Sequence, residues 1–282
     1  MARDILAAAH LSVDSALFIN RLMGIDSLPP VLALMNNVYY PDDQARVDDL
    51  TVAVLIEAGL IDTNGVVDPT LASWMRVLER PDIEVTLRGM QGDRMRRAVV
   101  ARQGESHVMA LRRNDELVVQ AVWSTTHSLD DVVSTPIWSA MRESADVLAP
   151  PPAEFESVTM PLQQVAELSA ASTPGDMVRA LRGELGLDMT TAKILNEVSA
   201  YSGQRCEIVM RENRGIQTVD TAAGVFVADT SYGRVLSAVG RQGSRLWVTF
   251  GPGTYARFRA AMSDLVQLTP SRDWFAAQVL RG

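Results

Sequence analysis

The chain has 282 residues, of which 47% are hydrophobic and 21% charged, a composition typical of a globular protein with a sizeable buried core. Its net charge of −8 disfavours binding to the anionic backbone of a nucleic acid, so no nucleic-acid partner is predicted. The amino-terminal apolar run is too short for a signal peptide and no run approaches the ~20 residues that cross a bilayer, so a cytoplasmic protein without membrane insertion is predicted.

The first part of the sequence predicts three helices. The first is expected at Val13–Met23, directly after Ser12, whose hydroxyl can accept a hydrogen bond from a backbone amide of the first turn. A short edge strand is expected at 31–35 after two consecutive prolines. The second and third helices are expected at 42–58 and 70–79.

Four short strands and an amphipathic helix are predicted next. The strands are expected at 83–88, 95–102, 107–113 and 117–123. The connection 89–94 contains two glycines and is expected to be long and flexible. The helix is expected near 128–142, where Ser128 and Asp131 occur at the spacing of a capping box.

The same order of elements then repeats. Three prolines in 149–153 predict an exposed linker. Helices are expected near 161–171, 174–185 and 190–200, strands at 206–211, 217–228, 235–239 and 246–250, and two further helices at 254–268 and 271–280. The repeat predicts an amino-terminal half at 1–148 and a carboxy-terminal half at 154–282.

The predicted fold class is therefore α/β of the α+β type. Two pseudo-symmetric halves, each made of helices and a four-stranded antiparallel meander, are expected to merge into one central twisted sheet with flanking helices. Such a body suits a rigid platform for a partner better than it suits a buried reaction pocket.

Residue types that carry catalysis are present but scattered. The three histidines, His10, His107 and His127, do not lie at metal-ligand spacing from one another or from Cys206. The lone cysteine excludes an intrachain disulfide, and a buried inert thiol is predicted because it falls in an expected strand. Thr126 to Asp130 brings triad residue types together, but a helix cap explains them. We predict no catalytic residue, no metal site and no cofactor.

A candidate binding surface comes from the alternation of residues along two strands. In 217–228, one phase is predicted to face the core; its members are Val219, Thr221, Ala223, Val225 and Val227. The other phase is small and polar except for Phe226, and Trp247 likewise alternates with aliphatic residues in its own strand. Both aromatics are expected on the side of the sheet opposite the core, where they are either covered by a helix or part of an interaction patch.

Several short motifs resemble the EspG proteins, which are cytosolic chaperones of mycobacterial type VII (ESX) secretion systems. In the second half the similar segments are 218–225, 229–234, 250–254 and 274–275. In the first half, 59–68, 99–103 and 107–112 occur in matching order. The resemblance therefore spans most of the chain, and the order and spacing of the motifs make it more specific than any one of them.

This resemblance implies a fold, a partner and a surface. It implies two similar halves around a twisted antiparallel sheet, no enzymatic activity, and a chaperone that binds the helical tip of the PPE protein in a PE–PPE heterodimer, keeps it soluble and targets it to secretion. It also implies contact through the central sheet and the helical bundle of the second half, and a variable loop at 89–94. The corresponding residues here are Asn196, Glu197, Thr218, Ala222, Phe226 and Trp247.

Two other functions are compatible with the pattern. A small-molecule-binding or enzymatic domain would use a cleft between the halves, and it predicts a deep pocket with convergent polar groups. An obligate homodimer with a structural role would instead bury the second phase of the strand residues between protomers.

Overall fold

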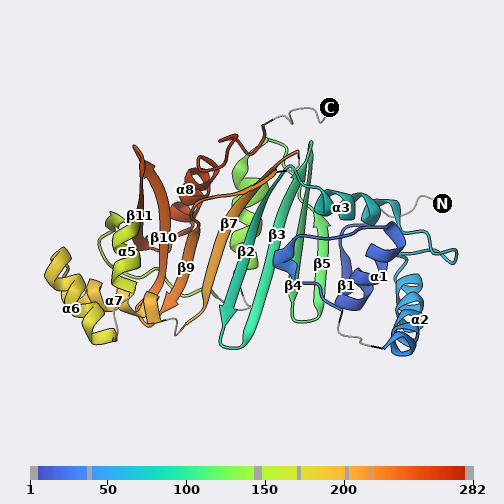
Figure 1. Ribbon diagram of the computed structural model, residues 1–282, viewed down its shortest axis with the longest axis horizontal. Coiled ribbons are helices and arrows are strands. Elements are labelled where there is room, and N and C mark those ends of the chain that lie inside the picture. The colour runs from blue at the N-terminus through green and yellow to red at the C-terminus, as the bar shows by residue number, and fades with distance from the viewer. Residues whose placement is uncertain are drawn as a thin grey trace.

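The computed structural model describes residues 6–36, 40–142, 148–169, 173–200, 203–215 and 217–276. Within these residues, eleven strands form one antiparallel sheet along the length of the molecule (Figure 1). The strand order is β1-β5-β4-β3-β2-β7-β9-β10-β11-β6, and β8 pairs with β7 off this path. The predicted α+β class with a central sheet is confirmed, while the pseudo-symmetry of two halves stays a prediction.

The strands have the following bounds in chain order. They are Ala9–Ser12 (β1), Ile83–Gln91 (β2), Arg94–Gln103 (β3), Ser106–Arg113 (β4), Glu116–Ala121 (β5), Val158–Pro161 (β6), Arg205–Arg214 (β7), Gln217–Asp220 (β8), Val225–Thr230 (β9), Gly233–Gln242 (β10) and Arg245–Pro252 (β11). The helices are Val13–Met23 (α1), Pro30–Leu32 (η1), Pro41–Glu57 (α2), Pro69–Glu79 (α3), Asp130–Ser134 (η2), Thr135–Ala140 (α4), Leu162–Ser169 (α5), Pro174–Leu185 (α6), Met189–Ala200 (α7) and Tyr255–Val266 (α8).

The early and late parts of the chain join where β2 pairs with β7. The antiparallel register runs without interruption from Ile83 opposite Glu212 to Met90 opposite Arg205. On the other edges, β2 pairs with β3, and β7 pairs with both β8 and β9. This one strand pair therefore makes a single sheet out of two meanders.

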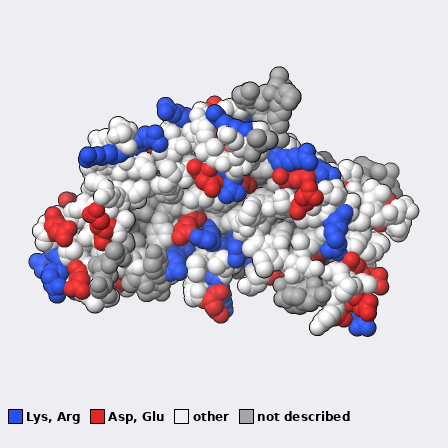
Figure 2. All heavy atoms as spheres, viewed as in Figure 1, with Lys and Arg blue, Asp and Glu red and all other residues white. Residues whose placement is uncertain are grey.

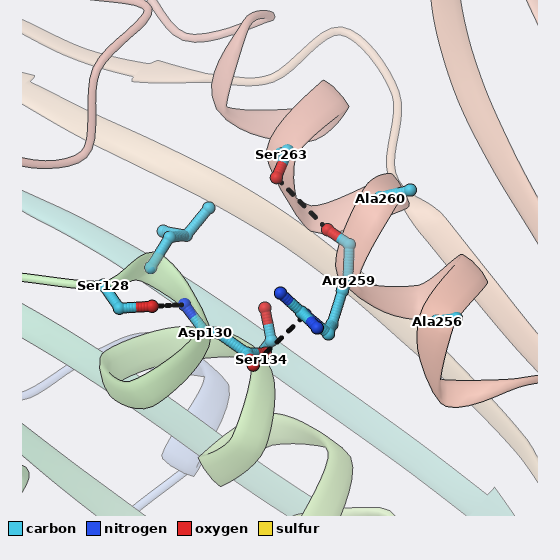
Figure 3. Close-up of a pocket in the computed structure, with 8 residues that line it drawn as sticks. Ser128, Asp130, Ser134, Ala256, Arg259, Ala260 and Ser263 are labelled. Atoms are coloured by element: carbon cyan, nitrogen blue, oxygen red, sulfur yellow. Dashed lines mark hydrogen bonds and ion pairs between the residues drawn. The ribbon is translucent and has the colours of Figure 1, made fainter.

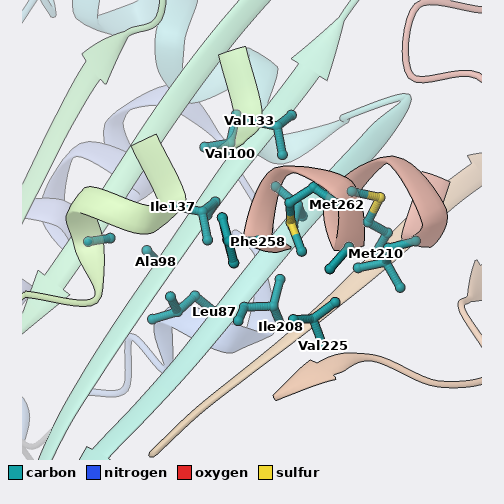
Figure 4. Close-up of a cluster of buried hydrophobic side chains, with 14 of the residues drawn as sticks. Leu87, Ala98, Val100, Val133, Ile137, Ile208, Met210, Val225, Phe258 and Met262 are labelled. Atoms are coloured by element: carbon teal, nitrogen blue, oxygen red, sulfur yellow. The ribbon is translucent and has the colours of Figure 1, made fainter. Parts of the chain in front are cut away.

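The largest core lies on the side of the sheet covered by α4 and α8, which we call the α8 face. Because successive residues of a strand point to opposite sides, β2 and β7 direct an aliphatic row to this face. Figure 4 shows part of the resulting cluster; its strand members include Leu87, Ala98, Val100, Ile208, Met210 and Val225, and its helix members include Ile137, Phe258 and Met262. The cluster draws on both meanders, so the two share this core.

On the opposite side, helices cover only the two ends of the sheet. Helices α1 and α3 pack over β3 to β5 through a cluster that includes Ile19, Leu71 and Met75. The α1 helix begins as predicted, since the Ser15 amide donates to the Ser12 hydroxyl at 3.0 Å. At the far end, Ile194 and Val198 of α7 pack against Ala228 of β9 and Val235 of β10. Helix η1 packs over β3 and β4 and touches β2, and between it and α7 the described residues leave β7 and the exposed end of β2 open on this side.

Two expected strands differ from the structure. The expected strand 31–35 is wrong, because 30–32 forms the 3-10 turn η1 and directs Leu32 into the core. The expected strand 217–228 is interrupted after Asp220, because β8 pairs with the end of β7 and β9 pairs with its beginning. Gly224 crosses β7 so closely that a Cβ there would lie 2.4 Å from the Ile208 carbonyl oxygen. The short edge strands β1 and β6 were not predicted.

An expected loop and an expected terminal helix also differ. In 89–94, β2 and β3 extend to Gln91 and Arg94, so a two-residue turn replaces the expected long loop. The expected terminal helix 271–280 does not form over 271–276, and the rest of it lies outside the described residues. That segment is instead fixed by Trp274, which is buried and donates its indole N–H to His107 Nε2 at 3.1 Å.

The proline-rich linker is exposed at 149–152, as expected, but Ala153 is only 1% exposed. The Arg234 amide donates to the Pro151 carbonyl at 2.7 Å, and the Ala153 amide donates to the Arg234 carbonyl at 2.9 Å. The expectation of exposure is therefore wrong for Ala153. The prolines lack donors, but their carbonyls and the next amide let the segment pair with β10.

We expect Gly233→Ala to lower the free energy of unfolding by about 2 kcal/mol or more. Gly233 has φ +112°, and an added Cβ would lie 2.5 Å from the Pro151 carbonyl oxygen. Urea unfolding measures the effect. Gly240→Ala is the matched control on the same strand, because a Cβ there meets no atom within 4 Å. Equal stability of the two variants would contradict the packing of 151–153 against β10.

Candidate partner-binding surface

The described helices leave part of the middle of the sheet uncovered on the side opposite the α8 face. In Figure 1, α1, α3 and η1 lie over one end of this side and α7 lies over the other; among the described residues, β7 and the exposed end of β2 lie open between them. We call the residues that β2, β7, β8 and β9 direct to this side the central face. Cross-strand register assigns to it Glu84, Thr86, Arg88, Glu207, Val209, Arg211, Thr218, Asp220 and Phe226.

Ionic pairs surround an apolar centre on the central face. Arg88 Nη2 lies 2.6 Å from a Glu207 carboxylate oxygen, and Arg211 Nε lies 2.6 Å from an Asp220 oxygen. Val209, on the strand between these pairs, is 37% exposed. Figure 2 shows both signs of charge mixed over the middle of this side. A surface of this kind can contact an apolar group at its centre and select it by charge at its margin.

Glu84 is a buried carboxylate at the base of the same face. Its Oε1 lies 3.6 Å from Arg211 Nη1, which is also paired with Asp220. Burial raises the pKa of Glu84 to about 7, Arg211 opposes this rise, and Asp220 adds to it. The carboxyl group of Glu84 therefore changes charge near neutral pH, directly beneath a surface arginine.

Helix α7 borders the central face and carries two of the predicted contact residues. Asn196 is half-buried on this helix. Glu197 accepts hydrogen bonds from the amide and the hydroxyl of Ser231, at 2.8 and 2.7 Å. Its carboxylate therefore ties α7 to the turn between β9 and β10. Beside that turn, Arg234 of β10 and Asp229 of β9 form a bidentate cross-strand pair, at 2.7 and 3.0 Å.

Three other predicted residues lie on or beside the central face. Thr218 is exposed on β8, and its hydroxyl donates to Asn213 Oδ1 at 2.7 Å. Ala222 is exposed in the segment that connects β8 to β9, outside any strand. Phe226 is on the central-face side of β9, opposite Glu207, and it packs half-buried against the cluster beneath α7.

Trp247 does not share a side with Phe226, so that expectation is wrong. Ser237 on β10 stands opposite both Phe226 and Phe250, which places Phe250 on the same side as Phe226. Trp247 is three residues from Phe250 on β11, and an odd separation along a strand puts it on the α8 face. The alternation of residues within one strand separates its two faces. It does not determine which of these faces lies on the same side of the sheet as a given face of another strand.

The sequence interpretation missed the charged pairs of the central face. These pairs involve Arg88 on β2 and Glu207 and Arg211 on β7. The aliphatic residues of the same strands predicted a buried core and no exposed face. The signal was nevertheless present, because 207–211 alternates charged or exposed residues with buried ones. A pair of amphipathic strands with exposed ionic residues is a cue for an open sheet face.

A pocket of about 440 Å³ lies between η2 and α8 (Figure 3). Its one ionic pair joins Arg259 Nε and Asp130 Oδ2 at 3.1 Å, while the Tyr255 hydroxyl donates to Asp130 Oδ1 at 2.6 Å. Both oxygens of Asp130 are thus engaged in joining two helices.

Cys206 and His107 have structural roles. Burial raises the pKa of the Cys206 thiol to about 11, which keeps it protonated at neutral pH. Burial likewise lowers the pKa of His107, which supports the neutral ring that accepts the Trp274 N–H. Among the described residues, no three His, Cys, Asp or Glu side chains could together hold a metal ion. None of the helices described is long and apolar enough to span a bilayer.

Comparison with known proteins relates nearly the whole chain to one family. The sequence model of the EspG family matches residues 12–264. The chain is 29% identical to the ESX-1 secretion-associated protein EspG1 of Mycobacterium marinum, over 96% of this chain and 92% of that protein. It is also 29% identical to the ESX-3 secretion-associated protein EspG3 of Mycolicibacterium smegmatis, over 97% and 91%.

The fold is shared with a solved structure. The Mycobacterium tuberculosis type VII secretion system chaperone EspG5, in complex with a PE25–PPE41 dimer, aligns with a TM-score of 0.80 at 20% identity. The alignment covers 96% of this chain and all of that chain. At this level of identity the likeness concerns the fold alone.

We expect Glu84→Gln to remove a pH dependence of stability. Because the folded-state pKa of Glu84 is about 7, above its ordinary 4.5, folding favours the protonated acid. Its contribution is complete below about pH 4.5 and is lost as the pH rises through 7, by about 3 kcal/mol. Thermal unfolding from pH 5 to 8 should therefore show the variant gaining stability relative to the parent as the pH rises. A constant difference between the two proteins would contradict this role.

Proposed function

The chain belongs to the EspG family, and we propose that it is a chaperone of a type VII (ESX) secretion system that binds the PPE subunit of a PE–PPE heterodimer. The single observation that carries the proposal is the fold, which matches over 96% of this chain that of EspG5, a chaperone solved with a PE–PPE dimer. The open central face is the surface that such a partner needs, because both neighbouring helical groups leave it uncovered.

The central face would act by covering an apolar helical tip. Strands β2 and β7 are hydrogen-bonded to neighbouring strands on both edges. Their surface is therefore already rigid and loses little conformational entropy when a partner binds. Val209 supplies the apolar contact, and the Arg88–Glu207 and Arg211–Asp220 pairs surround it. Covering the tip keeps the partner from aggregating, and the charges discriminate among partners.

The proposed contact set extends from the central face to α7. It contains Thr218 and Phe226 on the strands, Ala222 between them, and Asn196 and Glu197 on the helix. Glu197 acts by fixing α7 to the β9–β10 turn. Trp247 is not part of this set, since it lies on the α8 face.

The proposal also assigns a location and a kind of activity. A chaperone that meets its partner before export acts in the cytosol, and it works by binding rather than by catalysis. The Asp130 carboxylate is paired with Tyr255 and Arg259, and the Cys206 thiol is buried. Both observations support a non-enzymatic role.

Co-expression with PE–PPE pairs from different ESX systems, followed by size-exclusion chromatography, tests the proposal. We expect one pair to co-elute with this chain and to remain soluble only in its presence. Failure of every pair to co-elute would refute the proposal.

We expect Val209→Asp to weaken the complex about 30-fold or more, equivalent to about 2 kcal/mol of binding, because it places an unpaired charge at the apolar centre. Val219→Asp is the matched control: both valines are 37% exposed on adjacent strands, but Val219 pairs with Glu212 and so faces the other side. Titration calorimetry with the co-eluting pair measures both. Equal weakening by the two variants would mean that the partner does not use the central face.

A further inference from the structure

Three arginines form a row across the sheet where the central face meets η1. Arg88 of β2 stands directly opposite Arg97 of β3, and Arg97 stands directly opposite Arg112 of β4. Residues that are directly opposite in an antiparallel ladder point to the same side of the sheet. Because Arg88 belongs to the central face, all three guanidinium groups lie on that side. We call these three residues the arginine row.

The arginine row has more positive charge than the carboxylates around it balance. Glu207 of β7 stands opposite Arg88 and pairs with it at 2.6 Å. Arg97 and Arg112 form no ion pair with any residue that the structure describes. Like charges directly opposite one another on a sheet are destabilising. This local excess of positive charge occurs in a chain whose net charge is −8.

Backbone carbonyls in and beside η1 orient the two arginines that have no carboxylate. Arg112 donates through Nη1 to the Leu32 carbonyl at 2.8 Å and also to the Ala33 carbonyl. Arg97 donates through Nη1 to the Val31 carbonyl at 3.2 Å. These acceptors are dipoles and do not neutralise a full charge. Since a guanidinium group has several N–H donors, Arg97 retains donors for a further acceptor within the described part of the chain.

The surroundings of Arg97 disfavour its positive charge. Arg97 is half-buried, and the pKa of its guanidinium is lowered by burial first, then by Arg112 and by Arg88. The group still carries its charge at neutral pH, because arginine titrates far above that range. A carboxylate brought to this position would offset the repulsion and accept hydrogen bonds from two N–H groups at once.

We infer that Arg97, with Arg88 beside it, binds a carboxylate of the partner protein that covers the central face. The inference rests on the proposed function, since it takes the PPE subunit as the occupant of that face. A partner without an acidic residue at this position would cover the half-buried charge of Arg97 and leave it unpaired, which strongly disfavours binding. Arg97 is thus assigned as a residue that selects the partner.

The position of Arg97 relative to Val209 predicts where this carboxylate lies on the partner. Val209 stands opposite Thr86, which is two residues from Arg88 along β2, and Arg97 is one strand further on. The spacing of strands and the rise per residue put Val209 and Arg97 about 12 Å apart. Two turns of an α-helix span about 11 Å. We therefore expect an Asp or Glu about two turns from the residue of the helical tip that contacts Val209.

Titration calorimetry with the co-eluting PE–PPE pair, repeated at several salt concentrations, tests the role of Arg97. We expect Arg97→Gln to weaken binding about tenfold or more and to reduce the salt dependence of Kd, because it removes a charge that salt screens. Arg97→Lys keeps the charge and should keep most of the salt dependence. Arg257→Gln, the matched control, removes an exposed arginine of α8 on the other side of the sheet and should change neither quantity.

A double-mutant cycle tests whether the partner supplies the carboxylate. Each Asp and Glu of the PPE helical tip is replaced by Asn or Gln, and binding is measured to the parent chain and to Arg97→Gln. We expect one replacement to weaken binding to the parent but not to Arg97→Gln. Unchanged affinity of Arg97→Gln, or a loss that couples to no acidic residue of the tip, would overturn the inference alone. Failure of every PE–PPE pair to co-elute with the parent chain would instead refute the proposed function itself.

Discussion

The pairing of β2 with β7 is the interaction on which the rest of the structure depends. It joins strands more than one hundred residues apart in sequence, and its register fixes which side chains of both meanders point to α8. A shift by one residue would turn the aliphatic row outward and the ionic row inward. The same register places Arg88 opposite Glu207 and Glu84 opposite Arg211. Core formation and the candidate binding surface are thus two results of one alignment of strands.

The ionic residues of the central face contribute little to folding. Half-exposed pairs such as Arg88 with Glu207 are commonly worth less than about 1 kcal/mol. Glu84 lowers stability at neutral pH, because its burial is only partly offset by Arg211. A sheet selected for stability alone would place aliphatic residues under a covering helix at these positions. Under the proposed function these residues serve recognition instead, because charge placement decides which partner is accepted.

Local patterns in the sequence were sufficient for most elements and for the family, but not for the surface. Strong alternation predicted the strands around Val85, Val100 and Ile208, and the Ser12 cap predicted the start of α1. The edge strands β1 and β6 were not predicted, because four residues are too few to show a clear alternation of apolar and polar side chains. Phe226 and Trp247 were each assigned to a phase of a strand, but the sides of different strands coincide only through long-range register. A contact surface that spans several strands therefore needs the structure.

The two ends of the sheet have a consequence for solubility. The outermost strands, β1 and β6, are only four residues long, and the chain leaves each directly into a helix, at Val13 and Leu162. Pro161 also removes a backbone donor at the end of β6. Unpaired strand edges otherwise recruit further strands and start fibrous aggregation. Such short edges let this chain present a wide open sheet surface without adding copies of itself edge to edge.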